Sequence, residues 1–368
     1  MNFPQRTLIS HSTITSLISI GLVSVLACSC SDESVSEDAG QNTAPEFDIG
    51  VGDTDVRDDD PDTLIEDDVE LEDVEIEAGN TQQVTWDPFE MGDFSVARHS
   101  IDDAPVELLA FAPEESGDYP PVVFQHGFLM ANSHYGDLLE HLASHGFIVL
   151  APQMYDPGGL PWDAPSTEEE AQLASELYDW IEVDLGDHID VGVSSGLGLA
   201  GHSRGAKVLW WSLREDPRSV DAVAGVDPVD GTGGPLGGEP RVLDDPPTIN
   251  APIHLIGTGL GSESPSGFEP ACAPEDENYE AFFAAVASPA WQVVATEYGH
   301  LDMLDDDPED CGIECDVCVE GESREPMRIL TGGMMAALFR ATLHGEEWAF
   351  GFLDDESSAP VFIETESK

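Results

Sequence analysis

A serine between two glycines is the feature of this chain best suited to covalent chemistry. The segment Gly201-His202-Ser203-Arg204-Gly205 matches the G-x-S-x-G pattern of a nucleophile elbow, in which a sharp strand-to-helix turn exposes the serine hydroxyl. The pattern also arises by chance, so the residues before and after it decide whether it is an elbow. The apolar run 197–200 is typical of a buried strand, and the apolar residues within 206–213 are typical of a buried helix, which favours the elbow.

Three other patterns resemble known sites but lack a required feature. A second G-x-S-x-G match, at 192–196, is followed by glycines and a short apolar strand instead of a helix. The glycines of 196–201 lie in and before a strand, whereas a dinucleotide-binding loop needs them after it. His141 and His145 have zincin spacing, but Leu142 stands where that motif requires glutamate. We therefore expect neither a cofactor nor a metal.

A serine hydroxyl is too weak an acid to attack an ester unaided. An imidazole must take its proton and later return it to the leaving alcohol. His300 is the candidate base, because it follows the last predicted strand beside a flexible Gly299. Ser203, Asp227 and Phe128 also follow predicted strands, and ligands in open parallel sheets bind at the carboxyl ends of the strands.

Strands and helices alternate along the chain from about residue 96. The strands are continuous apolar runs, which predicts a mostly parallel α/β sheet with helices on both faces. Thr167 and Glu170 have the spacing of a capping box at the start of the second helix. The predicted strands are 96–101, 106–112, 121–125, 146–151, 197–200, 222–226, 253–257 and 291–295, and the predicted helices are 135–145, 167–183, the segment after Ser203, 278–287 and 327–343.

Several motifs, in this order, resemble those of chlorophyllases, which are α/β-hydrolases. The likeness runs from about residue 95 to residue 345 and implies ester hydrolysis by a Ser-His-Asp triad, with Ser203 as nucleophile, His300 as base and Asp227 orienting His300. The motifs are His126-Gly127-Phe128, the stretch 143–155, the elbow, Val226-Asp227-Pro228-Val229, the stretch 256–261, Cys272-Ala273-Pro274 and the stretch 298–307.

The acid of the triad has alternatives. Many α/β-hydrolases take it from the loop after the strand that corresponds to 253–257, but here a glycine stands at the usual carboxylate position. Asp227, one strand earlier, is the remaining strand-end candidate, and the resemblance places the acid there. Glu263 is the alternative acid, and Asp230 is a weaker third candidate.

Backbone amides are the expected donors to the oxyanion of the tetrahedral intermediate. The N–H of Arg204 follows the nucleophile, and the N–H of Phe128 follows His126-Gly127. His126 and His202 are expected to brace their turns. The side chain of Arg204 either pairs with an acidic neighbour or lines the pocket. Asp302 and the run 305–307 are expected to form a solvated or capped loop.

The first 82 residues differ in composition from the rest. Arg6 precedes an apolar run, 17–27, that is too short to span a bilayer and ends at Cys28. This predicts a signal peptide over 1–28, with a lipobox-like sequence that would lipidate Cys28 and anchor an extracytoplasmic protein to a bacterial membrane; cleavage and free secretion are the alternative. Residues 29–82 are predicted to be an acidic disordered tether, 83–350 the catalytic domain and 351–368 a polar tail.

The chain carries a formal net charge of −63 and only two lysines, Lys207 and Lys368. Such a balance argues against nucleic acid as a partner and against membrane contact other than through the N-terminal anchor. A saline habitat would explain the acidic excess. The even cysteine count after residue 30 predicts two disulfides in one of three pairings, a metal site being the alternative, among Cys272, Cys311, Cys315 and Cys318.

The sequence therefore predicts a carboxylic ester hydrolase that acts on an ester with a bulky apolar part, and the resemblance implies chlorophyll as that ester. One alternative is a cutinase-like or lipase-like polyester hydrolase. Another is a surface lipoprotein that binds ligands without catalysis, because a fold does not determine a function.

Overall fold

The computed structural model describes residues 86–156, 164–231, 238–266, 269–306, 308, 311, 315 and 317–368. The described residues all belong to one compact unit. The predicted signal peptide, Cys28 and the whole of the predicted tether lie outside the described residues, so these remain predictions.

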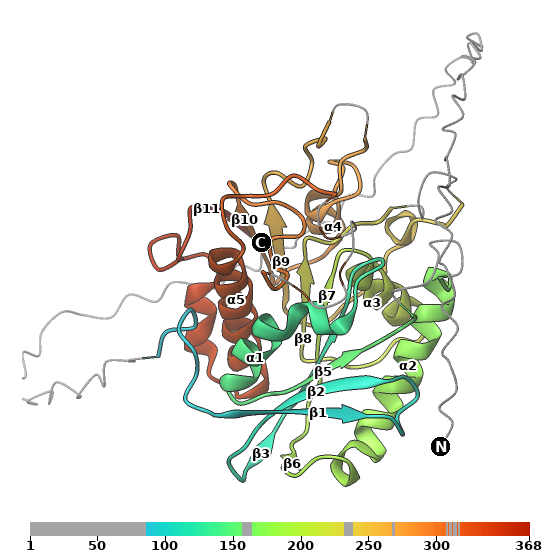
Figure 1. The fold of residues 1–368 in the computed structure, drawn as a ribbon, viewed down its shortest axis with the longest axis vertical. Helices are drawn as coiled ribbons and strands as arrows, with labels where there is room; N and C mark the ends of the chain where they lie inside the picture. Colours follow the sequence, from blue (N-terminus) through green and yellow to red (C-terminus); the bar gives the residue numbers. More distant parts are fainter. Residues whose placement is uncertain are drawn as a thin grey trace, which may run out of the picture. The chain divides into compact units, whose positions relative to one another are not determined.

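A nine-stranded sheet runs through this unit (Figure 1). The six strands from β5 to β10 in the spatial order are parallel, whereas β1, β2 and β11 pair antiparallel at the two edges. The order is β1 (Val96–Ile101), β2 (Leu108–Pro113), β5 (Ile148–Pro152), β4 (Pro121–Gln125), β7 (Gly198–His202), β8 (Ala222–Val226), β9 (Ile253–Thr258), β10 (Ala290–Ala295) and β11 (Ile363–Ser367). The short strands β3 (Asp118–Tyr119) and β6 (Gly192–Val193) form a separate parallel pair.

Helices cover both faces of the sheet, which makes two apolar cores. One core joins the sheet to α1 and α5, and the other joins it to α2, α3 and α4 (Figure 1). This arrangement confirms the predicted mostly parallel α/β architecture of the α/β-hydrolases. The α-helices are α1 (Gly136–Ser144), α2 (Thr167–Val183), α3 (Arg204–Glu215), α4 (Tyr279–Ala285) and α5 (Glu325–Leu343), and the 3₁₀ turns are η1 (Asn132–Tyr135), η2 (Leu185–Asp187), η3 (Val242–Asp244) and η5 (Glu347–Phe352).

The start of α2 differs in detail from the prediction. Ser166, not Thr167, is the N-cap, and its side chain accepts a hydrogen bond from the amide of Glu169 while Glu169 bonds back to Ser166. The capping box therefore lies one residue earlier than predicted. The Thr167 hydroxyl instead donates to Glu239, and Glu170 is buried against Arg204.

The C-terminal segment is part of the sheet. Residues 351–368 were predicted to be a polar tail, but Ile363–Ser367 forms edge strand β11, paired antiparallel with β10. Ile363 is buried, whereas the other side chains of the strand are partly or fully exposed, so the segment has the composition of a solvent-facing edge.

None of the helices in the described part of the chain combines the length and the apolar composition that a membrane span requires.

Candidate active site

Ser203 lies on the sharp turn between β7 and α3, as predicted for an elbow. Its backbone has φ 54° and ψ −121°, a left-handed conformation that non-glycine residues adopt only under constraint. The flanking glycines are required by close backbone contacts. A Cβ at Gly205 would lie 2.3 Å from the carbonyl oxygen of Gln125, and one at Gly201 would lie 2.6 Å from the carbonyl carbon of Gly205.

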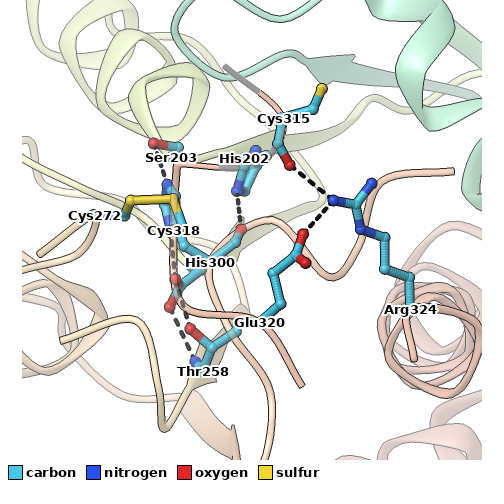
Figure 2. The surroundings of a disulfide bond; sticks show 10 residues. His202, Ser203, Thr258, Cys272, His300, Cys315, Cys318, Glu320 and Arg324 are labelled. Carbon is cyan, nitrogen blue, oxygen red and sulfur yellow. Dashed lines mark hydrogen bonds and ion pairs between the residues drawn. A yellow bond between two sulfur atoms is a disulfide. The ribbon is translucent and has the colours of Figure 1, made fainter. Parts of the chain in front are cut away.

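Ser203, His300 and Asp227 form one hydrogen-bonded chain. The Ser203 Oγ lies 2.9 Å from His300 Nε2, and His300 Nδ1 lies 2.6 Å from Asp227 Oδ2. Figure 2 shows the contact between Ser203 and His300. All three residues are buried, with 8%, 5% and 0% of their surfaces exposed for Ser203, His300 and Asp227. Because a carboxylate only accepts, His300 Nδ1 donates to it, which leaves Nε2 able to accept the serine proton.

The carboxylate of Asp227 is held by further hydrogen bonds. The amide of Thr258 donates to Oδ1 over 3.0 Å, and the Thr258 hydroxyl donates to Oδ2 over 2.8 Å. Together with His300, these donors satisfy a carboxylate that has no access to water. The backbone of Asp227 has φ 36°, a second strained residue at the end of a parallel strand.

Neither alternative acid reaches His300. Glu263 is exposed to solvent and its amide bonds to the carbonyl of Leu260. The buried Asp230 carboxylate accepts hydrogen bonds from the amides of Val242 and Leu243 at the start of η3. The structure therefore brings Asp227, and not Glu263 or Asp230, against the imidazole.

The two amides predicted to bind an oxyanion come from separate elements. Phe128 lies in the loop after β4, and Arg204 is the first residue of α3, where the helix dipole favours negative charge. Within the described part of the chain, neither N–H donates to a protein acceptor. Both donors are therefore available to a ligand.

The two histidines next to these amides brace the site. His202 Nε2 donates to the carbonyl oxygen of His300 over 2.9 Å (Figure 2), and its Nδ1 accepts from the Tyr135 hydroxyl over 2.8 Å. His126 Nε2 accepts from the amide of Met154. Burial lowers the pKa of His126 to about 4 and that of His202 well below its usual value, so both stay neutral.

The side chain of Arg204 pairs with acidic neighbours, one of the two options that the sequence left open. Its Nε lies 2.7 Å from Glu170 and one terminal nitrogen lies 2.8 Å from Glu239, while the other donates to the carbonyl of Pro165. The guanidinium also lies 5.4 Å from the ring centre of Phe128. Burial raises the pKa of Glu170 to about 7, against the opposing effect of Arg204.

The loop that carries His300 is tied by Asp302. Its carboxylate accepts 2.7 Å hydrogen bonds from the amides of Gly299 and Gly321. Asp305 caps α1 through the amides of Gly136 and Asp137. Both residues are capping groups as expected, Asp306 pairs with Arg328, and Asp307 lies outside the described residues.

Four cysteines form two disulfides, Cys272–Cys318 and Cys311–Cys315, which is one of the three predicted pairings. Figure 2 shows the first of them in the surroundings of Ser203 and His300. Among the described residues, His134, Cys311 and Cys315 have donor atoms within 4.8 Å of one another, as a metal site would. The two sulfur atoms are bonded to each other, however, and so are not thiolate ligands.

Comparisons with known proteins match the sequence of this chain to a family. The family model Chlorophyllase matches residues 84–368. Chlorophyllase-2 of Arabidopsis thaliana is 39% identical over 257 residues, which cover 66% of this chain and 79% of that protein. Chlorophyllase-1, chloroplastic, of Citrus unshiu is 36% identical over 272 residues (71% and 80%), and Chlorophyllase type 0 of Chenopodium album is 30% identical over 319 residues (80% and 89%). The chain belongs to the chlorophyllase family.

Proposed function

We propose that this protein is a serine carboxylic-ester hydrolase whose triad is Ser203, His300 and Asp227. The observation that carries the proposal is the continuous hydrogen-bonded chain from the Ser203 hydroxyl to the Asp227 carboxylate, built from the ends of three parallel strands. A ligand-binding protein without catalysis would not need a strained serine in contact with an oriented imidazole.

The geometry supports a two-step acyl transfer. Ser203 Oγ attacks the ester carbonyl carbon while its proton passes to His300 Nε2, and Asp227 stabilises the imidazolium. The amides of Phe128 and Arg204 donate to the oxyanion. Collapse of the tetrahedral intermediate breaks the bond to the alcohol, which takes the proton from His300. Water then attacks the acyl-serine by the same route, so the acid is released and Ser203 regains its proton.

The proposed substrate is an ester with a bulky apolar alcohol, with chlorophyll as the specific candidate. Its hydrolysis would give chlorophyllide and phytol. Support for this choice comes from the family, whose members named above are chlorophyllases. A polyester or a lipid ester is the competing substrate class, because pocket details decide specificity within one fold.

A panel of esters tests both the chemistry and the substrate. Short and long p-nitrophenyl esters, chlorophyll and a polyester film are incubated with wild type, Ser203→Ala and Ser194→Ala. Ser194 is the matched control, since it occupies the second G-x-S-x-G segment. We expect Ser203→Ala to lower kcat by about 10⁶-fold and Ser194→Ala to retain wild-type rates. Labelling with a fluorophosphonate should be confined to Ser203.

Three outcomes of the panel are informative. Chlorophyll turnover with a higher kcat/KM than the polyester supports the proposed substrate, and the reverse favours the cutinase-like alternative. Wild type that neither hydrolyses any ester nor accepts the fluorophosphonate at Ser203 overturns the enzymatic proposal in favour of a binding protein.

We also propose an extracytoplasmic location through a lipid anchor at Cys28. The apolar run before Cys28 supports it, as do the two disulfides, because disulfides persist in oxidising compartments. Mass spectrometry of the mature N-terminus tests the anchor. A diacylglyceryl group on Cys28 is the expected result, and an unmodified N-terminus beyond Cys28 contradicts it.

A further inference from the structure

Three consecutive amides in the loop after β4 differ in what they donate to. The N–H of Gly127 donates to the Tyr135 hydroxyl over 3.0 Å, and the N–H of Leu129 donates to the Tyr155 hydroxyl over 2.8 Å. Between them, the N–H of Phe128 has no protein acceptor within the part of the chain that the structure describes. Two tyrosine hydroxyls therefore hold the amides on either side of the one that remains free.

The loop needs external support to keep this conformation. Leu129 has φ 61°, which is unfavourable for a residue with a branched side chain. Within the loop, the amide of Met130 bonds to the carbonyl of Gly127, which closes a tight turn around Phe128. The hydrogen bonds from the tyrosines offset the cost of the strained backbone and limit the directions in which the Phe128 N–H can point.

Tyr135 also connects this loop to the histidine of the triad. Its hydroxyl donates to His202 Nδ1, and His202 Nε2 donates to the carbonyl of His300. The direction of each bond is fixed, because a carbonyl only accepts and a neutral imidazole has one donor and one acceptor. Tyr135 is fully buried, and burial raises the pKa of its phenol, so it keeps the proton that it donates.

Tyr155 supports the other side of the loop from a different strand end. It follows β5, and its carbonyl accepts a hydrogen bond from the Gln153 side chain over 2.8 Å. The Gln153 Oε1 in turn accepts from the amide of Asn132. The ring of Tyr155 packs edge-on against the ring of His126. The hydroxyl thus approaches Leu129 from a segment that is itself anchored.

We propose that Tyr135 and Tyr155 are positioning residues that aim the Phe128 N–H at the oxyanion. The proposal rests on the proposed ester hydrolysis and adds to it two residues that do not touch the reacting atoms. It predicts that loss of either hydroxyl weakens binding of the tetrahedral intermediate and leaves binding of the ground-state ester nearly unchanged. In kinetic terms, kcat falls and KM does not rise.

The test uses Tyr135→Phe and Tyr155→Phe in the full chain, with Tyr119→Phe as the matched control. The Tyr119 hydroxyl also bonds to the backbone, at the carbonyl of Glu115, but it lies on β3, outside the main sheet. Each variant is assayed with one p-nitrophenyl ester for kcat and KM. The inhibition constant of an alkylboronic acid, which forms a tetrahedral adduct with an active serine, is measured alongside.

Loss of an oxyanion donor costs about 10²–10³-fold in kcat, so a misaimed donor should cost about 10-fold or more. We expect that loss for both variants, with KM within about twofold of wild type and boronate affinity falling in proportion to kcat. Tyr119→Phe should match wild type. Tyr155 is only partly buried, so its variant carries the test even if Tyr135→Phe does not fold.

Two results would overturn the proposal. A folded Tyr155→Phe that keeps both kcat and boronate affinity within twofold of wild type removes the positioning role, and so does a variant whose KM rises while kcat is unchanged. Failure of the underlying function gives a different pattern, because wild type itself would then show no hydrolysis that Ser203→Ala abolishes, and both proposals would fall.

Discussion

Asp227 and Glu263 can be distinguished by a single pair of substitutions. Asp227→Asn keeps the size of the side chain, but its amide can no longer stabilise the imidazolium, and it disfavours the His300 tautomer that donates from Nδ1. We expect a loss of about 10⁴-fold in kcat. Glu263→Gln is the matched control, because it makes the same chemical change on an exposed residue.

The measurement is kcat at neutral pH for both variants with one soluble ester. Near-wild-type turnover by Asp227→Asn together with a large loss in Glu263→Gln would move the acid to the loop after β9. Comparable rates for wild type and both variants would mean that His300 needs no carboxylate in this protein.

Side chains whose role follows from their place on a strand were predictable from the sequence. Ser203, Asp227, His300 and Phe128 all follow apolar strands, and parallel strands bring their carboxyl ends to one edge. The partners of Arg204 were not predictable, because Glu170 and Glu239 lie 34 and 35 residues away in the chain and no sequence motif links either of them to Arg204. The roles of Tyr135 and Tyr155 were not predictable either, because their hydroxyls bond to backbone amides and no sequence motif marks such a contact.

Helices and strands could be predicted from the sequence where they carry a periodic or continuous apolar pattern. Helix α2 has the predicted bounds, and the predicted strands of the main sheet agree with those observed to within a few residues. Strands β3 and β6 have two residues each, too few for a periodic signal. Strand β11 was not predicted because its sequence, IETES, is polar, and an edge strand needs only one buried face.

The disulfide Cys272–Cys318 joins two segments that lie next to the loops of Asp227 and His300. On one side, the residue after Cys272 donates its amide to Gly261, and a Cβ on Gly261 would lie 3.0 Å from Asp227 Oδ2. On the other side, a Cβ on Gly299 would lie 1.7 Å from the carbonyl of Val319, next to Cys318. The bridge therefore limits movement of the loops that hold Asp227 and His300.

Replacing both Cys272 and Cys318 by serine should lower stability and kcat together. The bridge closes a 46-residue separation, for which chain entropy gives about 4 kcal/mol, against about 2 kcal/mol for the 4-residue separation of Cys311 and Cys315. We expect kcat to fall about 10-fold with the first pair. The second pair, changed in the same way, is the control. Urea unfolding and ester kinetics measure the two effects.

A larger loss of kcat from the second pair than from the first would contradict this assignment. It would place the more important constraint at the Cys311–Cys315 bridge, which lies beside His134. Equal kcat in wild type and both double variants would show that the loops are held by Asp302 and the sheet alone.

As the pH falls, the charge of the whole molecule and the burial of its histidines have opposite effects on folding stability. Carboxylates dominate the formal charge of −63, and their mutual repulsion weakens as they become protonated. The buried histidines act in the other direction. Burial lowers the pKa of His145 and His254 to about 3 and that of His126 to about 4, so the folded chain keeps them neutral where the unfolded chain protonates them.

His254 gives the clearest test of this second effect. It lies on β9 with 0% of its surface exposed, and neither ring nitrogen has a hydrogen-bond partner among the described residues. Its pKa is about 3 in the folded chain and about 6.5 in the unfolded chain. The unfolded state therefore binds more protons below pH 6.5, and the stability that a neutral His254 contributes is lost progressively as the pH falls from 6.5 towards 3.

Between pH 7 and pH 5 this single group should cost about 2 kcal/mol of unfolding free energy. His254→Leu fills a similar volume and cannot be protonated, so its stability should fall by about 2 kcal/mol less than that of wild type over this interval. Urea unfolding of both proteins at the two pH values measures the difference, in which the contributions of Glu170 and of the surface carboxylates cancel. Parallel pH dependence in the two proteins would mean that His254 gains a proton, or a partner, inside the folded sheet.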